Sequence, residues 1–218
     1  MKKMILHVLF PALFLGLLCL SAQADTVTYQ VTVNTSSQSG NDGYIDLQLN
    51  QGSLGSLPIT ASITNFAGGV LNPIDGNNDA IGTSGNLPGT LTIPADISTD
   101  YFERLTFGNS ISFDITLSGT GVNLAGLAGG SSGTTFVLGF WDDSTIVPLF
   151  TSDPYGATGL IDIANDGTVS VEALPDPSGG DSLATIVATP EPSTLSFFAC
   201  AGAALLLLRR RFAGMIIR

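Results

Sequence analysis

Hydrophobic and polar residues alternate along much of the chain between residues 25 and 173. The period of two is clearest in 27–33, 45–50 and 110–117, where Val, Ile, Leu, Tyr or Phe at every second position is separated by polar residues. Such alternation is typical of strands with one buried and one solvated face. Similar reasoning predicts further strands over 59–66, 89–93, 134–141, 160–163 and 168–173.

Segments rich in Gly, Asn and Asp separate these predicted strands. Asn165-Asp166-Gly167, between 160–163 and 168–173, predicts a tight β-hairpin. The longest stretch that allows an amphipathic helix is 95–107. About 150 residues is a normal size for one domain. We therefore expect an all-β domain over 25–173, a β-sandwich or jelly roll, with a closed barrel as the alternative.

The first 24 residues have the three-part form of a secretory signal peptide. Lys2 and Lys3 precede an apolar stretch over 4–20, and Ala22-Gln23-Ala24 follows as a small-residue cleavage site. Ala22 and Ala24 are thus the predicted signal-cleavage residues. We expect the protein to be exported across the inner membrane, with a mature chain that begins at Asp25.

The amino-acid composition of the chain changes at residue 174. Residues 174–188 are rich in Pro, Gly and Ser, which predicts a flexible linker. Residues 195–208 are largely apolar and span about 21 Å as a helix, against about 30 Å for the hydrocarbon core of a bilayer. On length alone a buried or interfacial helix stays open. The adjacent cluster favours a short transmembrane helix with its basic end on the cytoplasmic side: Arg209, Arg210 and Arg211.

A Pro-Glu-Pro sequence stands just before this apolar run, at Pro190, Glu191 and Pro192. In this order, residues 189–218 resemble the PEP-CTERM sorting signal of exported bacterial proteins. The resemblance implies recognition by an exosortase, a membrane protease, with cleavage near the Pro-Glu-Pro motif and membrane retention by the arginines until then. It also implies transient anchoring, followed by transfer to the cell surface or the exopolysaccharide matrix.

The tail departs from that pattern in two respects. Residues 212–218 continue past the arginines, and Ser196 and Cys200 interrupt the apolar run. The β domain itself, with Val33-Asn34-Thr35-Ser36-Ser37 followed by Gly43-Tyr44-Ile45-Asp46-Leu47-Gln48-Leu49-Asn50, looks like one shared by a group of PEP-CTERM proteins without an assigned biochemical activity. The resemblance therefore implies a route for the protein and leaves its chemistry open.

Charge and composition exclude several classes of function. Residues 25–191 hold one cation, Arg104, and all eighteen anions of the chain, a formal charge of 1 − 18 = −17. Such a surface repels phosphate backbones, so we expect no nucleic-acid partner. The same range holds no His, Cys or Lys. It therefore cannot build a Ser-His-Asp or Cys-His triad, a His or Cys zinc site, or a Lys Schiff base. We expect Arg104 to form an ion pair near Asp100 or Glu103.

Carboxylates are the remaining candidates for chemistry. Asp75, Asn77 and Asp79 have the spacing of oxygen ligands in a calcium loop, although Ala80 and Asn86 stand where an EF-hand has Gly and Glu. Calcium is thus the one candidate cofactor, and a solvated turn is the alternative.

Asp142 and Asp143 form a second candidate pair beside Trp141. Trp141 is out of phase with Phe136, Leu138 and Phe140, which indicates exposure only if the strand runs that far. An exposed Trp141 would suit sugar stacking, but we favour packing in the core or at a strand edge.

The function that we expect is that of a non-enzymatic cell-surface or exopolysaccharide-matrix protein sorted by its C-terminal tail. A carbohydrate-binding or calcium-dependent adhesive module is the alternative. A third hypothesis, a carboxylate-only glycoside hydrolase, survives the composition because that chemistry needs no His.

Overall fold

The computed structural model describes residues 26–52, 58–72, 79–96, 99–122, 133–164 and 166–189. In these ranges the chain is all-β, as predicted, apart from one 3-10 turn, η1 (Ser36–Gln38). The strands are β1 (Thr26–Asn34), β2 (Asp42–Gln51), β3 (Thr60–Leu71), β4 (Asp79–Ile81), β5 (Ser84–Gly85), β6 (Leu91–Pro94), β7 (Asp100–Ser118), β8 (Thr134–Asp142), β9 (Ala157–Ile163), β10 (Val169–Ala173) and β11 (Ala184–Thr189).

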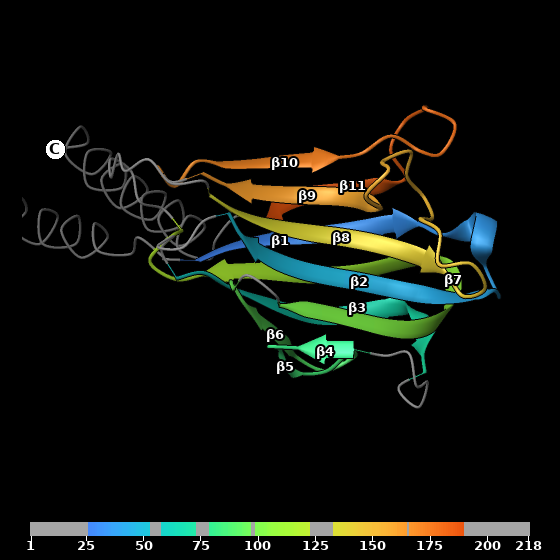
Figure 1. Ribbon diagram of the computed structural model, residues 1–218, viewed down its shortest axis with the longest axis horizontal. Coiled ribbons are helices and arrows are strands. Elements are labelled where there is room, and N and C mark those ends of the chain that lie inside the picture. The colour runs from blue at the N-terminus through green and yellow to red at the C-terminus, as the bar shows by residue number, and fades with distance from the viewer. Residues whose placement is uncertain are drawn as a thin grey trace, which may run out of the picture. The chain divides into compact units, whose positions relative to one another are not determined.

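The named strands pair antiparallel in one hydrogen-bonded sheet (Figure 1). The main path runs β10-β9-β8-β2-β7-β3-β6-β5, β1 joins β7 to β11, and β4 pairs with β7. The long strand β7 links two parts of this sheet, since residues 100–106 pair with β2 and residues 110–118 pair with β1. Both parts contribute to one hydrophobic core. This arrangement is consistent with the predicted β-sandwich.

Alternating side chains of the strands form that core, as the sequence predicts. Ile45, Leu47 and Leu49 of β2 are fully buried. Phe113 of β7 and Phe140 of β8 are buried in the same cluster. The intervening residues of these strands point to the opposite side of the sheet, so β2, β7 and β8 each present a second, outward row of side chains.

Two glycines lie where β3 and β7 pass from one part of the sheet to the other. Gly68 of β3 has φ +98°, and a Cβ there would collide with the carbonyl oxygen of Ser110. A Cβ on Gly108 of β7 would collide in turn with the carbonyl oxygen of Gly68. The two backbones approach so closely that neither position accommodates a side chain.

The boundaries of the domain differ from the sequence prediction at its C-terminal end. Residues 184–189, which comprise the end of the predicted linker 174–188 and the first residue of the predicted tail 189–218, form β11 and pair with β1 over residues 28–33. The prediction of a spacer throughout this range is wrong, because the β-forming Thr-Ile-Val-Ala sequence completes the ladder on the free edge of β1. The helix allowed over 95–107 is also absent from the described residues, where Asp100–Phe107 forms the first half of β7.

The hairpin predicted around residues 165–167 is confirmed by the antiparallel pairing of β9 and β10, and Asn165 itself lies outside the described residues. Val169 pairs with Ile163, and the Ala164 N–H donates to the carbonyl of Thr168 over 2.8 Å. Among the described residues, no helix is long and apolar enough to cross a membrane. The signal peptide 1–24, the Pro-Glu-Pro motif, the apolar run 195–208 and the arginines 209–211 lie outside the described residues.

Candidate functional site

Polar and aromatic side chains gather on the outward row of β2 and its two neighbours. Register places Tyr44 between Trp141 of β8 and Arg104 of β7, and Asp46 between Gly139 and Phe102. Gln48 lies opposite Asp100. We call this group the outer-face cluster, defined as Tyr44, Asp46, Gln48, Asn50, Asp100, Phe102 and Trp141.

Asp46 forms hydrogen bonds with several other members of the outer-face cluster. Its carboxylate accepts hydrogen bonds from Nε2 of Gln48, at 3.1 Å and 3.2 Å to its two oxygens, and from Nε1 of Trp141 at 3.2 Å. The side chain is only 8% exposed. Burial raises the pKa of Asp46, although the hydrogen bonds from Gln48, Asp100 and Trp141 partly offset this. A carboxylate this buried is stabilised by its donors.

Asp100 sits beside Asp46 as a second, more weakly satisfied carboxyl group. Its Oδ1 atom is buried without a hydrogen-bond partner among the described residues. Burial, the negative charge of Asp46, a hydrogen bond to Asp46 and the charge of Asp79 together raise the pKa of Asp100 to about 7. Two carboxyl groups in such contact favour sharing one proton.

The Trp141 side chain is fixed against the sheet by two glycines. A Cβ on Gly156 would lie 2.5 Å from the Cζ2 atom of Trp141, and one on Gly139 would lie 3.3 Å from Nε1. The indole ring thus occupies space that side chains at these two positions would need. Trp141 is partly exposed and does not belong to the hydrophobic core, so core packing, one of the two placements that we favoured, does not occur.

Tyr44, which lies opposite Trp141, and Phe102, which lies opposite Asp46, stack on each other within the outer-face cluster. Their rings stack with centroids 4.5 Å apart and an interplanar angle of 13°. Tyr44 is fully buried although it belongs to the outward row of β2. The outer face is therefore partly covered by its own large side chains.

Arg104 binds carboxylates other than those predicted. Its Nε and Nη2 atoms donate to the two oxygens of Asp143 at 2.9 Å and 2.8 Å, and Nη2 also donates to Asp42 at 2.9 Å. The prediction of a pair with Asp100 or Glu103 is wrong, because Glu103 points to the core side of β7, and Asp42 and Asp143 lie at the strand ends nearest Arg104. The hydrogen bond from Arg104 lowers the pKa of Asp143.

Asp142 and Asp143 have separate roles. Asp142 closes the turn after β8, where its Oδ1 accepts from the backbone N–H of Thr145 at 3.0 Å and of Val147 at 3.1 Å. Hydrogen bonds from Thr145, Ser144 and Val147 lower the pKa of Asp142. Asp143 instead belongs to the ion pair with Arg104. The two carboxylates that the sequence suggested as a pair are therefore engaged with different partners.

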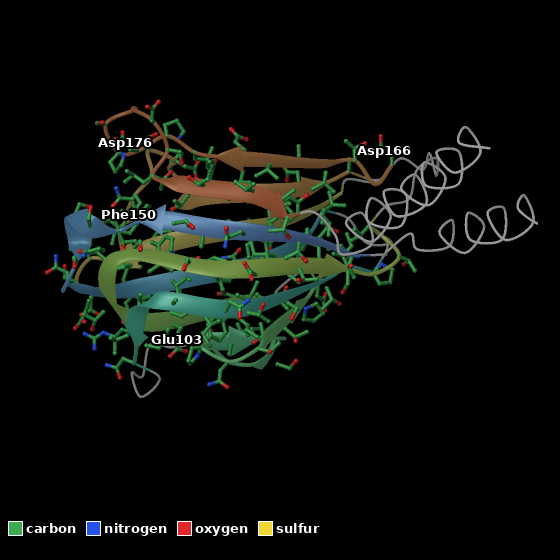
Figure 2. All side chains as sticks on the ribbon, turned by 180° about the vertical axis from the view of Figure 1, so that it is seen from behind. Glu103, Phe150, Asp166 and Asp176 are labelled. Carbon is green, nitrogen blue, oxygen red and sulfur yellow. The ribbon has the colours of Figure 1, made fainter. Side chains whose placement is uncertain are left out.

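Other Asp side chains close turns in the same manner. Asp176 Oδ1 accepts from the N–H groups of Ser178 at 2.9 Å and Gly180 at 2.7 Å, and Asp166 accepts from the Thr168 N–H at 2.9 Å. Figure 2 shows Asp166 and Asp176 at opposite ends of the β9 and β10 pair. Hydrogen bonds lower the pKa of both groups. Part of the acidic composition is thus used in turn formation.

Glu103 is a buried carboxyl group on the core side of β7, labelled in Figure 2. It is 8% exposed, and burial raises its pKa, which a hydrogen bond with Tyr101 partly offsets. Tyr101 accepts a hydrogen bond from the Leu87 N–H at 3.1 Å, and burial raises its pKa to about 12. The sequence contains a signal that could have identified this buried carboxyl group, because Glu103 has the same parity as the core-facing Tyr101 and Leu105.

The predicted calcium loop is only partly within the described residues. Asp75 and Asn77 lie outside them, and Asp79 is exposed at the start of β4, where its Oδ1 accepts from the Ala80 N–H at 2.8 Å. Within the described ranges, no group of three or more His, Cys, Asp or Glu residues could hold a metal ion. Calcium binding by Asp75, Asn77 and Asp79 stays a prediction.

Comparison with known proteins gives no match. No protein-family model matches the sequence, and no match was found among curated proteins or solved structures.

Proposed function

We propose that this is a non-enzymatic exported protein of the cell surface or exopolysaccharide matrix, sorted by its C-terminal tail. The observation that carries the proposal is the order of features along the chain: a signal peptide, an acidic β domain, Pro190-Glu191-Pro192, an apolar run and Arg209–211. The partners that follow are an exosortase-type membrane protease and, through a short helix over 195–208, the membrane. We take the domain to be a β-sandwich or jelly roll.

The points at which the chain enters and leaves the sheet support this proposal. Thr28 of β1 pairs with Thr189 of β11, and the Thr189 hydroxyl donates to the Thr28 carbonyl at 3.0 Å. The chain thus enters the sheet after the signal peptide and leaves it before the tail at neighbouring points. The proposed tail therefore follows directly from β11, so a membrane helix in the tail would tether the domain through this strand.

The chemistry of the carboxyl groups favours a role without catalysis. Asp46 and Asp100 are in hydrogen-bonding contact. Glycoside hydrolysis by a carboxyl pair instead uses groups about 5–9 Å apart, with room for the substrate between them. Together with the lack of His, Cys and Lys over 25–191, this supports a binding or structural role.

Substitution within the tail tests the sorting proposal. We expect Glu191→Ala to reduce release of the domain from the membrane fraction, because it alters the motif that the protease is proposed to recognise. Thr185→Ala, an exposed position on β11, is the matched control. The measurement is the amount of protein in membrane, surface and medium fractions of the producing strain. Equal distribution of wild type and Glu191→Ala would count against the proposal.

The alternative function is a carbohydrate-binding module, and the partly exposed Trp141 beside polar side chains of β2 favours it. Retention of the protein on polysaccharide tests this alternative. A calcium-dependent adhesive role rests on Asp75, Asn77 and Asp79, and predicts a higher melting temperature with calcium than with magnesium. No change with calcium would exclude that form of the alternative.

A further inference from the structure

We propose that Trp141 and the outward row of β2 form a binding subsite for a neutral, hexose-based polysaccharide chain. The inference rests on the alternative function above and assigns it a place and a ligand class. The residues proposed to line the subsite are the partly exposed Trp141, Gln48 and Asn50, and the buried Asp46 positions Trp141 and Gln48 through its hydrogen bonds.

Trp141 supplies the surface on which a sugar ring can stack. The hydrogen bond from Nε1 to Asp46 and the close fit over Gly139 and Gly156 fix the position of the indole. Since the ring is held before any ligand binds, little side-chain entropy is lost on binding. An aromatic face of this kind contacts the apolar C–H face of a pyranose ring.

Polar groups continue from Trp141 along the same face of β2. Asn50 Nδ2 donates to Gln48 Oε1 at 3.0 Å, and Gln48 Nε2 donates to Asp46. Alternate residues of a strand lie about 7 Å apart, so these groups form a row that an extended chain of sugars can follow. Carboxamides and carboxylates offer acceptors and donors that match sugar hydroxyls, which is the usual combination with an aromatic contact in ligand sites.

Electrostatics restricts the ligand to a neutral one. Asp46 and Asp100 both lie in the outer-face cluster, and residues 25–191 carry a formal charge of 1 − 18 = −17. A polymer of uronic acids would bring a carboxylate with each ring and would be repelled. Neutral hexoses carry no such penalty.

The single tryptophan of the chain provides a direct measurement. Because the sequence contains no other Trp, selectively excited indole fluorescence reports on Trp141 alone. We would titrate the full-length protein, solubilised in detergent, with hydroxyethylcellulose as the neutral probe and with alginate as the anionic probe. The expected result is a saturable shift of the emission maximum with hydroxyethylcellulose and no shift with alginate.

Affinity electrophoresis in gels containing the same polymers compares the variants. Trp141→Ala should weaken retention by hydroxyethylcellulose at least about tenfold, as expected when a central aromatic contact is removed. Trp141→Phe, which keeps an apolar face, should retain most of the binding. Val187→Ala, at an exposed position on β11, is the control and should bind as wild type. Gln48→Ala tests the polar row independently of Trp141 and should also weaken retention. This variant keeps the proposal testable if Trp141→Ala does not fold.

The outcomes separate the subsite from the general function. Retention that is equal in wild type, Trp141→Ala and Gln48→Ala would overturn the subsite and leave carbohydrate binding in place. Stronger retention by alginate than by hydroxyethylcellulose would overturn the ligand class. No saturable shift and no retention with either polymer would overturn the subsite and the carbohydrate-binding alternative together.

Discussion

At the scale of single residues, the outward row of β2 shows how burial changes the behaviour of ordinary acidic side chains. Asp46 has three donors or partners around it, whereas Asp100 keeps one buried oxygen without a hydrogen bond among the described residues. Asp100 therefore favours its protonated form, whereas the charged form of Asp46 is stabilised by its hydrogen-bonding neighbours. The pair makes the stability of the domain depend on pH.

The first prediction concerns that pH dependence. The pKa of Asp100 is about 7 in the folded protein and about 4 in an unfolded chain. Between these values the folded state binds more protons, so its free energy of unfolding falls as pH rises from about 4 to about 7. Burial of Asp46 and Glu103, whose pKa values are also raised, acts in the same direction.

In Asp100→Asn, the free energy of unfolding should decrease less as pH rises through this range, because an amide has no proton to lose and no charge to repel Asp46. Urea denaturation of wild type and variant at several pH values across this window measures it. Asp181→Asn, at an exposed position, is the control and should follow wild type. An unchanged pH slope in Asp100→Asn would show that the Asp46 and Asp100 pair does not cause it.

The second prediction concerns Arg104, the one cation between residues 25 and 191. Arg104→Lys keeps the charge but loses the two parallel hydrogen bonds to Asp143, so we expect a loss of about 1 kcal/mol in the free energy of unfolding. Arg104→Ala should cost more, about 1–2 kcal/mol, because Asp42 also loses its hydrogen bond from Arg104 and keeps the one from Thr106. Equal stability of wild type and Arg104→Ala would contradict this role.

At the scale of elements, each of the eight predicted segments overlaps a strand of the structure, although residues 59, 89, 90 and 168 lie outside the strands that were predicted to include them. In most of these strands one parity of residues packs inward, and this pattern is local enough to be visible in the sequence, whereas β10 has no buried residue. The first half of β7 was missed because Glu103 faces the core side and Phe102 faces outward, which breaks the alternation of polarity. β4, β5 and β11 were missed because they are short edge strands with few buried residues.

The candidate site was less predictable than the strands. The phase of Trp141 left its placement open between solvent, core and strand edge, and nothing in the sequence distinguished Asp46 from other polar residues of an outward row. Its contacts depend on register, which sets β8 and β7 beside β2 across long separations in the chain. The partners of Arg104 were likewise decided by register rather than by proximity in sequence.

The third prediction tests the close approach of β3 and β7. Gly68→Ala should destabilise the domain by about 2–4 kcal/mol, since the positive φ disfavours an L side chain and the new methyl collides with the Ser110 carbonyl. Gly40→Ala is the matched control, because Gly40 also has a positive φ, +84°, but no atom lies within 4 Å of its Cβ position. The difference in free energy of unfolding between the two variants isolates the collision. Equal effects would show that the strands separate easily at this point.

The fourth prediction concerns β11. A chain that ends at residue 189 keeps the ladder with β1 and should unfold cooperatively at nearly the melting temperature of the full-length protein. A chain that ends at residue 183 exposes the edge of β1 and should be less stable and more prone to aggregation. Circular dichroism on heating compares the two. Similar melting curves would indicate that β11 contributes little to the domain.

At the scale of the whole molecule, the end of the folded domain and the start of the proposed sorting motif are adjacent. Thr189 is the last residue of β11, and Pro190 follows directly. The segment before the motif is therefore part of the sheet, and a protease that cuts in the motif must work close to folded structure. Removal of the tail should leave β11 in place and the domain intact.

Mass spectrometry of both termini of the protein recovered from envelope and medium tests the account most directly. In the producing strain we predict an N-terminus at Asp25 and a C-terminus within or just after the Pro-Glu-Pro motif, so that β11 is retained. In a strain without the exosortase we predict the same N-terminus and an intact tail in the membrane fraction. A chain that ends at Arg218 in every fraction of both strains would contradict the claim that the tail is a removable sorting signal.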